Sequence, residues 1–190
     1  IYKPEMHDNI MIEQQESERN TTSGKFYMES ALSEMSIMSA IIHKKPDYIE
    51  KSLDMLLEYM TVHKISVYTW STAKKQWQTA YILGKDENDI RLPFLNDTEE
   101  DFFKYFNAYH FFHMDNINNL DTMDKEKFHM YLNGNVSSTL EILQQAEDSD
   151  KKTLICLDIY KPARTLPKHK IVFAIMAATL ISQELSSTME

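Results

Sequence analysis

The sequence predicts an α/β fold of the α+β kind, built on a central antiparallel sheet of five to six strands. Two pairs of neighbouring segments have strand composition, and each pair is joined by a short polar turn, which predicts two β-hairpins. Consecutive hairpins require antiparallel pairing, because parallel neighbours need long crossover connections. Helical segments precede the first hairpin and follow the second. We therefore expect the N- and C-terminal helices to pack on one face of the sheet and an irregular helix and loop region to cover the other.

Length and composition fit a single globular domain. The chain has 190 residues, of which 43% are hydrophobic, and domains of about 100–200 residues are usual. Residues 1–24 are polar and aperiodic, so we expect a linker there with a short helix around residues 9–18. Residues 25–190 would form the folded domain. Because the chain begins at Ile1, we also expect it to be a segment of a longer protein.

Three helices are predicted from apolar periodicity. Residues 25–42 carry apolar side chains at steps of three and four, the spacing of a helix with one buried face. Residues 47–62 repeat this pattern more regularly, with charged side chains on the opposite face. A long closing helix is predicted over residues 168–186. Two of these helices precede the first hairpin in the sequence, and the third follows the second hairpin.

The four hairpin strands are predicted at residues 65–70, 77–83, 137–144 and 152–160. Residues 154–157 are apolar at consecutive positions, which is typical of a strand buried on both faces. We therefore expect this strand to lie at the centre of the sheet.

The region between the hairpins is less regular. Residues 84–101 are acidic and predicted to be irregular, and residues 102–109 are aromatic and predicted to be helical. A short strand is predicted over residues 110–114, followed by a loop with a short helix over residues 115–135. This region is long enough to cover the second face of the sheet.

Charge and glycine content exclude several classes of partner. The net charge is −9, from 29 acidic and 20 scattered basic side chains. Binding to nucleic acid or to an anionic membrane needs clustered Lys and Arg, so neither partner is expected. The longest apolar stretch, residues 171–181, is too short to cross a bilayer. Only three glycines are present, far apart, which argues against phosphate-binding loops.

The residues with catalytic or metal-binding chemistry are few. Cys156 is the single cysteine, so an intrachain disulfide and a multi-cysteine metal site are excluded, and a reducing, cytoplasmic location fits. In an apolar strand Cys156 should act as a small apolar residue. His110 and His113 would point to opposite faces of a strand and could not share one metal ion. We expect no catalytic residues and no metal, and the sequence identifies no cofactor.

Several segments together resemble one known family. Residues 56–60 followed by residues 65–70 look like its helix and first strand, and residues 112–116 look like the short strand before its pocket helix. Residues 133–142 look like its turn into the fourth strand. The family is that of GAF domains, and the resemblance covers residues 30–187. The Ile-Gly that the family often places in the next strand is absent here, as is the motif of cyclic-nucleotide-binding members. A PAS-like sensor is the alternative fold, with fewer helical residues before its first strand.

The resemblance implies a non-catalytic sensory or regulatory module of a bacterial signalling protein. Such a module binds a small molecule, dimerises, or does both, and controls an output domain in the same chain. The output is often a diguanylate cyclase (GGDEF) or phosphodiesterase (EAL) of cyclic-di-GMP signalling, and histidine kinases and transcription factors also carry GAF domains. Some relatives reduce methionine sulfoxide with several cysteines, so the single Cys156 argues against that activity.

An aromatic cluster lies where the family has its pocket lid. Its members are Phe102, Phe103, Tyr105, Phe106, Tyr109, Phe111 and Phe112. These rings either line a ligand pocket or fill the core beneath the sheet, and the absence of a clearly placed charged partner favours core filling. If a pocket exists, its predicted lining residues are Tyr105, Tyr109, His113, Asp115 and Ser138.

The terminal helices carry a second candidate surface. The apolar residues of the closing helix occupy two adjoining stripes, of which one should bury against the sheet. The other stripe, together with the first helix, is predicted to form a homodimer interface. The predicted interface residues are Leu32, Met35, Met38, Ile175 and Thr179. A purely structural dimerisation module with a filled pocket is the alternative to a ligand-binding sensor.

Overall fold

The computed structural model describes residues 29–43, 47–85, 91–132, 135–145 and 150–188. The short helix expected around residues 9–18 lies outside them. The centre is a five-stranded antiparallel sheet in the order β2-β1-β5-β4-β3. Its strands are β1 (Lys64–Ser71), β2 (Gln76–Gly84), β3 (Phe111–Met114), β4 (Val136–Gln145) and β5 (Lys152–Tyr160). The sheet and its two hairpins confirm the predicted fold class.

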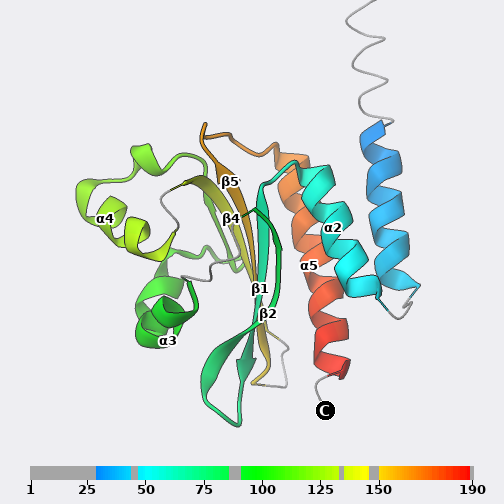
Figure 1. The fold of residues 1–190 in the computed structure, drawn as a ribbon, viewed down its shortest axis with the longest axis horizontal. Coiled ribbons are helices and arrows are strands. Elements are labelled where there is room, and N and C mark those ends of the chain that lie inside the picture. Colours follow the sequence, from blue (N-terminus) through cyan, green and yellow to red (C-terminus); the bar gives the residue numbers. More distant parts are fainter. Residues whose placement is uncertain (1–28, 44–46, 86–90, 133–134, 146–149, 189–190) are drawn as a thin grey trace, which may run out of the picture.

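Helices cover both faces of the sheet, as Figure 1 shows. On one side lie α2 (Tyr48–Met60), α5 (Lys168–Thr188) and an outer helix of residues 29–42, which we call the N-terminal helix. On the other side lie α3 (Arg91–Phe102) and α4 (Thr122–Tyr131), accompanied by the 3-10 turns η1 (Phe103–Tyr105) and η2 (Ile117–Asn119). The terminal helices therefore share one face of the sheet, as predicted.

The central strand β5 joins two hydrophobic cores. Its residues 153–159 are all buried, and alternate side chains enter opposite cores. Ile155 and Leu157 pack with α2, α5 and the N-terminal helix, whereas Leu154 and Cys156 pack with the aromatic residues beneath α3 and α4. This confirms the central place that the apolar run predicted for the strand, because a strand covered on both faces has no solvent side.

The sequence prediction was wrong over residues 91–101, which lie in α3 and not in an irregular stretch. Tertiary contacts hold this helix. Leu95 is fully buried in the same core as Trp77. The Asn96 side chain accepts a hydrogen bond from the Trp77 backbone N–H at 2.7 Å and donates one to the Trp77 carbonyl at 3.3 Å. Such packing stabilises a helix whose own residues give a weak signal. Residues 103–109 form η1 and a loop instead of the predicted helix.

Gly84 provides a test of the β2 geometry. Its φ is +101°, and a Cβ at this position would lie 2.1 Å from the His63 carbonyl oxygen. We expect Gly84→Ala to lower the free energy of unfolding by about 1–3 kcal/mol, because both the backbone angle and the contact become strained. Urea denaturation measures the change. Thr72→Ala, at an exposed position of the β1–β2 turn, is the control and should stay within about 0.5 kcal/mol of wild type. Equal midpoints for the two variants would contradict this account.

Candidate functional site

A buried network of charged side chains lies between the sheet and α3. Arg91, the first residue of α3, donates from Nη1 and Nη2 to the two carboxylate oxygens of Asp158 on β5, each at 2.6 Å. Its Nη2 also donates to Glu141 Oε1 on β4 at 3.1 Å. Thr139 Oγ1 donates to Asp158 at 2.8 Å, and the Tyr131 hydroxyl donates to Glu141 at 2.9 Å. None of these five residues is more than 3% exposed.

Burial and mutual charge decide the protonation of this network. Burial by itself would lower the pKa of Arg91, but the charge of Asp158 raises it well above its usual value, so the guanidinium stays positive. Burial raises the pKa of Glu141 from its ordinary value near 4.5 to about 7, and the neighbouring Asp158 adds to this rise while Arg91 opposes it. Burial also raises the pKa of Tyr131, which therefore acts as a hydrogen-bond donor. Pairing offsets the several kcal/mol that each buried charge costs.

Aromatic rings enclose the network. The Arg91 guanidinium lies 4.9 Å from the centre of the Tyr131 ring, within range of a cation–π interaction. Phe94 of α3 packs on Tyr131, with 5.0 Å between ring centroids. Four rings of the predicted aromatic cluster pack into the core beneath α3 and α4, namely Phe103, Tyr105, Phe106 and Phe112. Phe111 packs into the core on the opposite face of the sheet. The side chain of Phe102 lies outside the described residues.

The charged network was not singled out by sequence analysis. Asp158 interrupts the apolar run of β5, and Glu141 lies between the apolar Leu140 and Ile142 on β4. A charge at such a position requires a buried partner. That interruption is the signal from which the two carboxylates could have been found. Their partner Arg91 lies 50 and 67 residues away in the sequence, within the segment predicted to be irregular.

The predicted ligand-lining residues lie in different surroundings. Tyr109 is 79% exposed, outside the aromatic core. Tyr105 is half-buried, and its hydroxyl donates to Asp124 at 2.5 Å. His113 on β3 is half-buried, burial lowers its pKa, and its Nε2 is a buried atom without a hydrogen-bond partner among the described residues. A ligand contact for these residues stays a prediction.

The other two predicted residues, Ser138 and Asp115, are brought together. Ser138 Oγ donates to the Asp115 carbonyl at 2.7 Å and accepts from the Arg164 backbone N–H at 2.9 Å. The Arg164 guanidinium in turn donates to the carbonyls of Met60 and Thr61 at the C-terminal end of α2, at 3.0 and 2.7 Å. Ser138 thus links the loop after β3 to the loop before α5, and Arg164 extends that link to α2.

Cys156 has the surroundings of a structural residue. It lies directly across from Glu141 in the β4–β5 pairing and is fully buried. Burial raises the pKa of its thiol, and a protonated thiol is a poor nucleophile. Among the described residues, no group of three or more His, Cys, Asp or Glu side chains is arranged to hold a metal ion.

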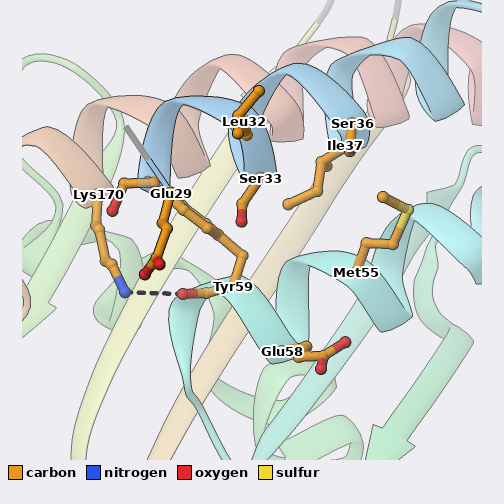
Figure 2. Close-up of a pocket in the computed structure, with 10 residues that line it drawn as sticks. Glu29, Leu32, Ser33, Ser36, Ile37, Met55, Glu58, Tyr59 and Lys170 are labelled. Atoms are coloured by element: carbon orange, nitrogen blue, oxygen red, sulfur yellow. Dashed lines mark hydrogen bonds between the residues drawn. The ribbon is translucent and has the colours of Figure 1, made fainter. Parts of the chain in front are cut away.

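The second candidate surface is formed by the terminal helices. A hollow of about 460 Å³ lies between the N-terminal helix, α2 and α5, and Figure 2 shows residues that line it. In this hollow Lys170 Nζ donates to the Tyr59 carbonyl at 2.7 Å. A larger groove of about 1050 Å³ runs between the N-terminal helix and α5. Its large apolar lining residues are Met35, Met38, Val172, Phe173 and Met176.

The exposure of these side chains refines the predicted interface. Leu32 and Met35 are 59% and 68% exposed, and Met38 is half-buried. On α5, the exposed apolar residues are Val172 and Met176, each 53% exposed, whereas the predicted Ile175 and Thr179 are half-buried. The groove therefore has apolar side chains on both of its helices, and a contact between two copies of the chain remains a prediction.

No described helix has the combination of length and apolar character that crossing a membrane would require. No protein-family model matches the sequence, and no curated protein matches it either.

Solved structures do match the chain. The GAF domain of an Acinetobacter phosphoenolpyruvate-protein phosphotransferase is 12% identical, with a TM-score of 0.56 over 82% of this chain and 91% of that one. The dark state of JSC1_58120g3 with bound biliverdin is 10% identical, with a TM-score of 0.59 over 82% and 98%. The phytochrome photosensory core module of Stigmatella aurantiaca is 9% identical, with a TM-score of 0.66 over 85% and 37%. The chain therefore has the fold of GAF domains, and identities this low establish the fold alone.

The raised pKa of Glu141 predicts a specific pH dependence of stability. Because the folded state favours the protonated carboxyl, the stability that Glu141 contributes is fully present below about pH 4.5 and is lost as the pH rises towards 7. Glu141→Gln keeps the shape but cannot ionise, so it should remove this part of the dependence. Urea midpoints of wild type and variant at several pH values between 4.5 and 7.5 measure the difference. A constant difference across this range would contradict the assignment.

Proposed function

We propose that the chain is a non-catalytic regulatory module that forms a homodimer through the N-terminal helix and α5 and controls an output domain in the same protein. The observation that carries the proposal is the groove between these helices. Met35, Val172 and Met176 line it and each exposes more than half of its surface. Contiguous apolar patches of this kind on a folded protein mark interaction sites.

A second copy of the chain is the occupant that the groove fits. A two-fold dimer needs one patch that is complementary to itself, and here the patch combines apolar centres from two long, neighbouring helices. Its lining also includes charged and polar residues, with Glu34 on the N-terminal helix and Lys168 and His169 on α5. An apolar centre with a polar rim is the usual anatomy of an interface. Two copies would pack these helices as a four-helix layer.

Regulation would act through the packing of that layer. A signal that favours one dimer arrangement over another shifts the population between them, provided that it binds the two with different affinity. The terminal helices would carry the shift to an output domain, for which a diguanylate cyclase or phosphodiesterase of cyclic-di-GMP signalling and a histidine kinase are candidates. We place such a protein in the cytoplasm of a bacterium and assign no cofactor to it.

Binding of a small molecule on the α3 side is the second candidate function. The buried Arg91 network fills the space between α3 and the sheet in this conformation, which favours dimerisation as the first function to test. The buried Cys156 thiol, with its raised pKa, supports a role without catalysis.

A charge placed in the groove should break the dimer. We expect Met35→Glu and Val172→Glu each to raise the dimer dissociation constant by on the order of tenfold or more, because a carboxylate would be buried without a partner. Multi-angle light scattering over a dilution series measures the mass. Met123→Glu is the matched control, since Met123 is 83% exposed on α4, on the opposite side of the sheet. A wild-type protein that stays monomeric throughout the series would refute the proposal.

A further inference from the structure

The face of the sheet under α3 carries two cross-strand rows of side chains in its middle strands, and all but Cys156 are polar. Strand pairing places Lys64, Asp158 and Thr139 directly across from one another in one row, and Ser66, Cys156 and Glu141 in the next. All six are at most 4% exposed. Cross-strand partners share a face of a sheet, so these side chains form one polar floor at the centre of the domain.

The guanidinium of Arg91 lies on this floor but comes from α3, not from the sheet. Two parallel hydrogen bonds to Asp158, a third to Glu141 and the face of Tyr131 surround it. A bidentate carboxylate with an aromatic face is the arrangement by which proteins recognise planar guanidinium groups. We call the residues around the guanidinium, Asp158, Glu141, Thr139 and Tyr131, the clamp. An ammonium group lacks the planar pair of donors that the Asp158 carboxylate of the clamp accepts.

The fit is incomplete at two buried atoms. Arg91 Nε and Ser66 Oγ have no hydrogen-bond partner among the described residues, although both residues are nearly or fully buried. Buried polar atoms are rarely left unpaired, because each costs free energy when water is removed. The two terminal nitrogens of Arg91 therefore satisfy the clamp, whereas its Nε and the hydroxyl of Ser66, on β1 in the same row as Glu141, stay unsatisfied.

We propose that Asp158, Glu141, Thr139 and Tyr131 form a binding site for a small ligand with a guanidinium group, which Arg91 occupies until the ligand displaces it. The exchange conserves the charge of the clamp, since one guanidinium replaces another. A free ligand is not held by a helix, so it can shift within the clamp until its remaining N–H donors meet acceptors that the tethered Arg91 Nε does not reach. The site accounts for buried charges that an ordinary apolar core would not need.

Displacement has a structural consequence that rests on the proposed regulatory function. Arg91 is the first residue of α3, so its release would free the start of that helix from the sheet. On β4, Thr139 of the clamp directly follows Ser138, which is hydrogen-bonded to the loop that leads to α5. Arg164 in that loop holds the C-terminal end of α2. A change at the clamp thus has a short bonded route to the helices of the dimer surface.

The first arm of the test uses Arg91→Ala, which removes the guanidinium that occupies the clamp. Methylguanidinium should bind this variant saturably and raise its melting temperature, because it binds only the folded clamp. Methylammonium should bind at least tenfold more weakly, and the uncharged methylurea should give no shift. Adding Asp158→Asn to Arg91→Ala should weaken methylguanidinium binding at least tenfold. A folded Arg91→Ala protein that methylguanidinium does not stabilise would overturn the proposal.

The second arm uses the wild-type protein and does not depend on the folding of a variant. The Arg91 Nε–H resonance, assigned by its loss in Arg91→Lys, should move saturably on addition of methylguanidinium. The half-saturating concentration should exceed that for Arg91→Ala, because the tethered side chain competes. An unmoved resonance would show a purely structural ion pair and overturn the proposal. Light scattering on the same samples reports the dimer separately, so failure of the dimer and failure of the ligand site are distinguishable.

Discussion

The fold depends on covering β5 on both of its faces. Seven consecutive residues of this strand are buried, so a helical layer is required on each side of the sheet. The two layers differ in chemistry. The terminal helices pack against aliphatic side chains, whereas α3 packs over paired charges and aromatic rings. Charges can lie in such an interior only when their partners are in place, so the position of α3 and the pairing of Arg91 depend on each other.

Sequence periodicity predicts the elements whose own residues carry a regular pattern. The amphipathic stripe of α2 and the apolar run of β5 fixed both elements and the central position of the strand. Residues 91–102 lack such a stripe and include Pro93 and several acidic side chains. Their helix depends on the contacts of Leu95 and Asn96 with the region of Trp77 on β2. A pattern confined to one segment contains no information about contacts of that kind.

Of the two candidate sites, the helix surface follows from a local sequence pattern, whereas the charged network depends on tertiary contacts. Helical spacing predicts an apolar outer surface on α5. Which of its apolar residues are exposed depends on how the helix is rotated about its own axis, and in the structure these are Val172 and Met176. The charged network depends on pairs of residues that are far apart in the sequence, because Arg91 lies 50 residues from Glu141 and 67 from Asp158. Glu141 and Asp158 show in the sequence that a buried partner is needed, because each lies between two apolar neighbours within a strand. Which cation meets them is decided only when the chain folds α3 over the sheet and brings Arg91 to them.

The two hydrogen bonds between Asn96 and Trp77 also protect the sheet from other chains. β2 is an edge strand of nine residues, and the outward backbone groups of such a strand are a template for pairing with a foreign strand. At Trp77 the Asn96 amide already satisfies both the N–H and the carbonyl, much as a neighbouring strand would. α3 therefore blocks pairing with a foreign strand at this position of the edge. If α3 moved away from the sheet, the backbone N–H and carbonyl of Trp77 would become available to a strand of another molecule. Loss of solubility would then report the displacement of this helix.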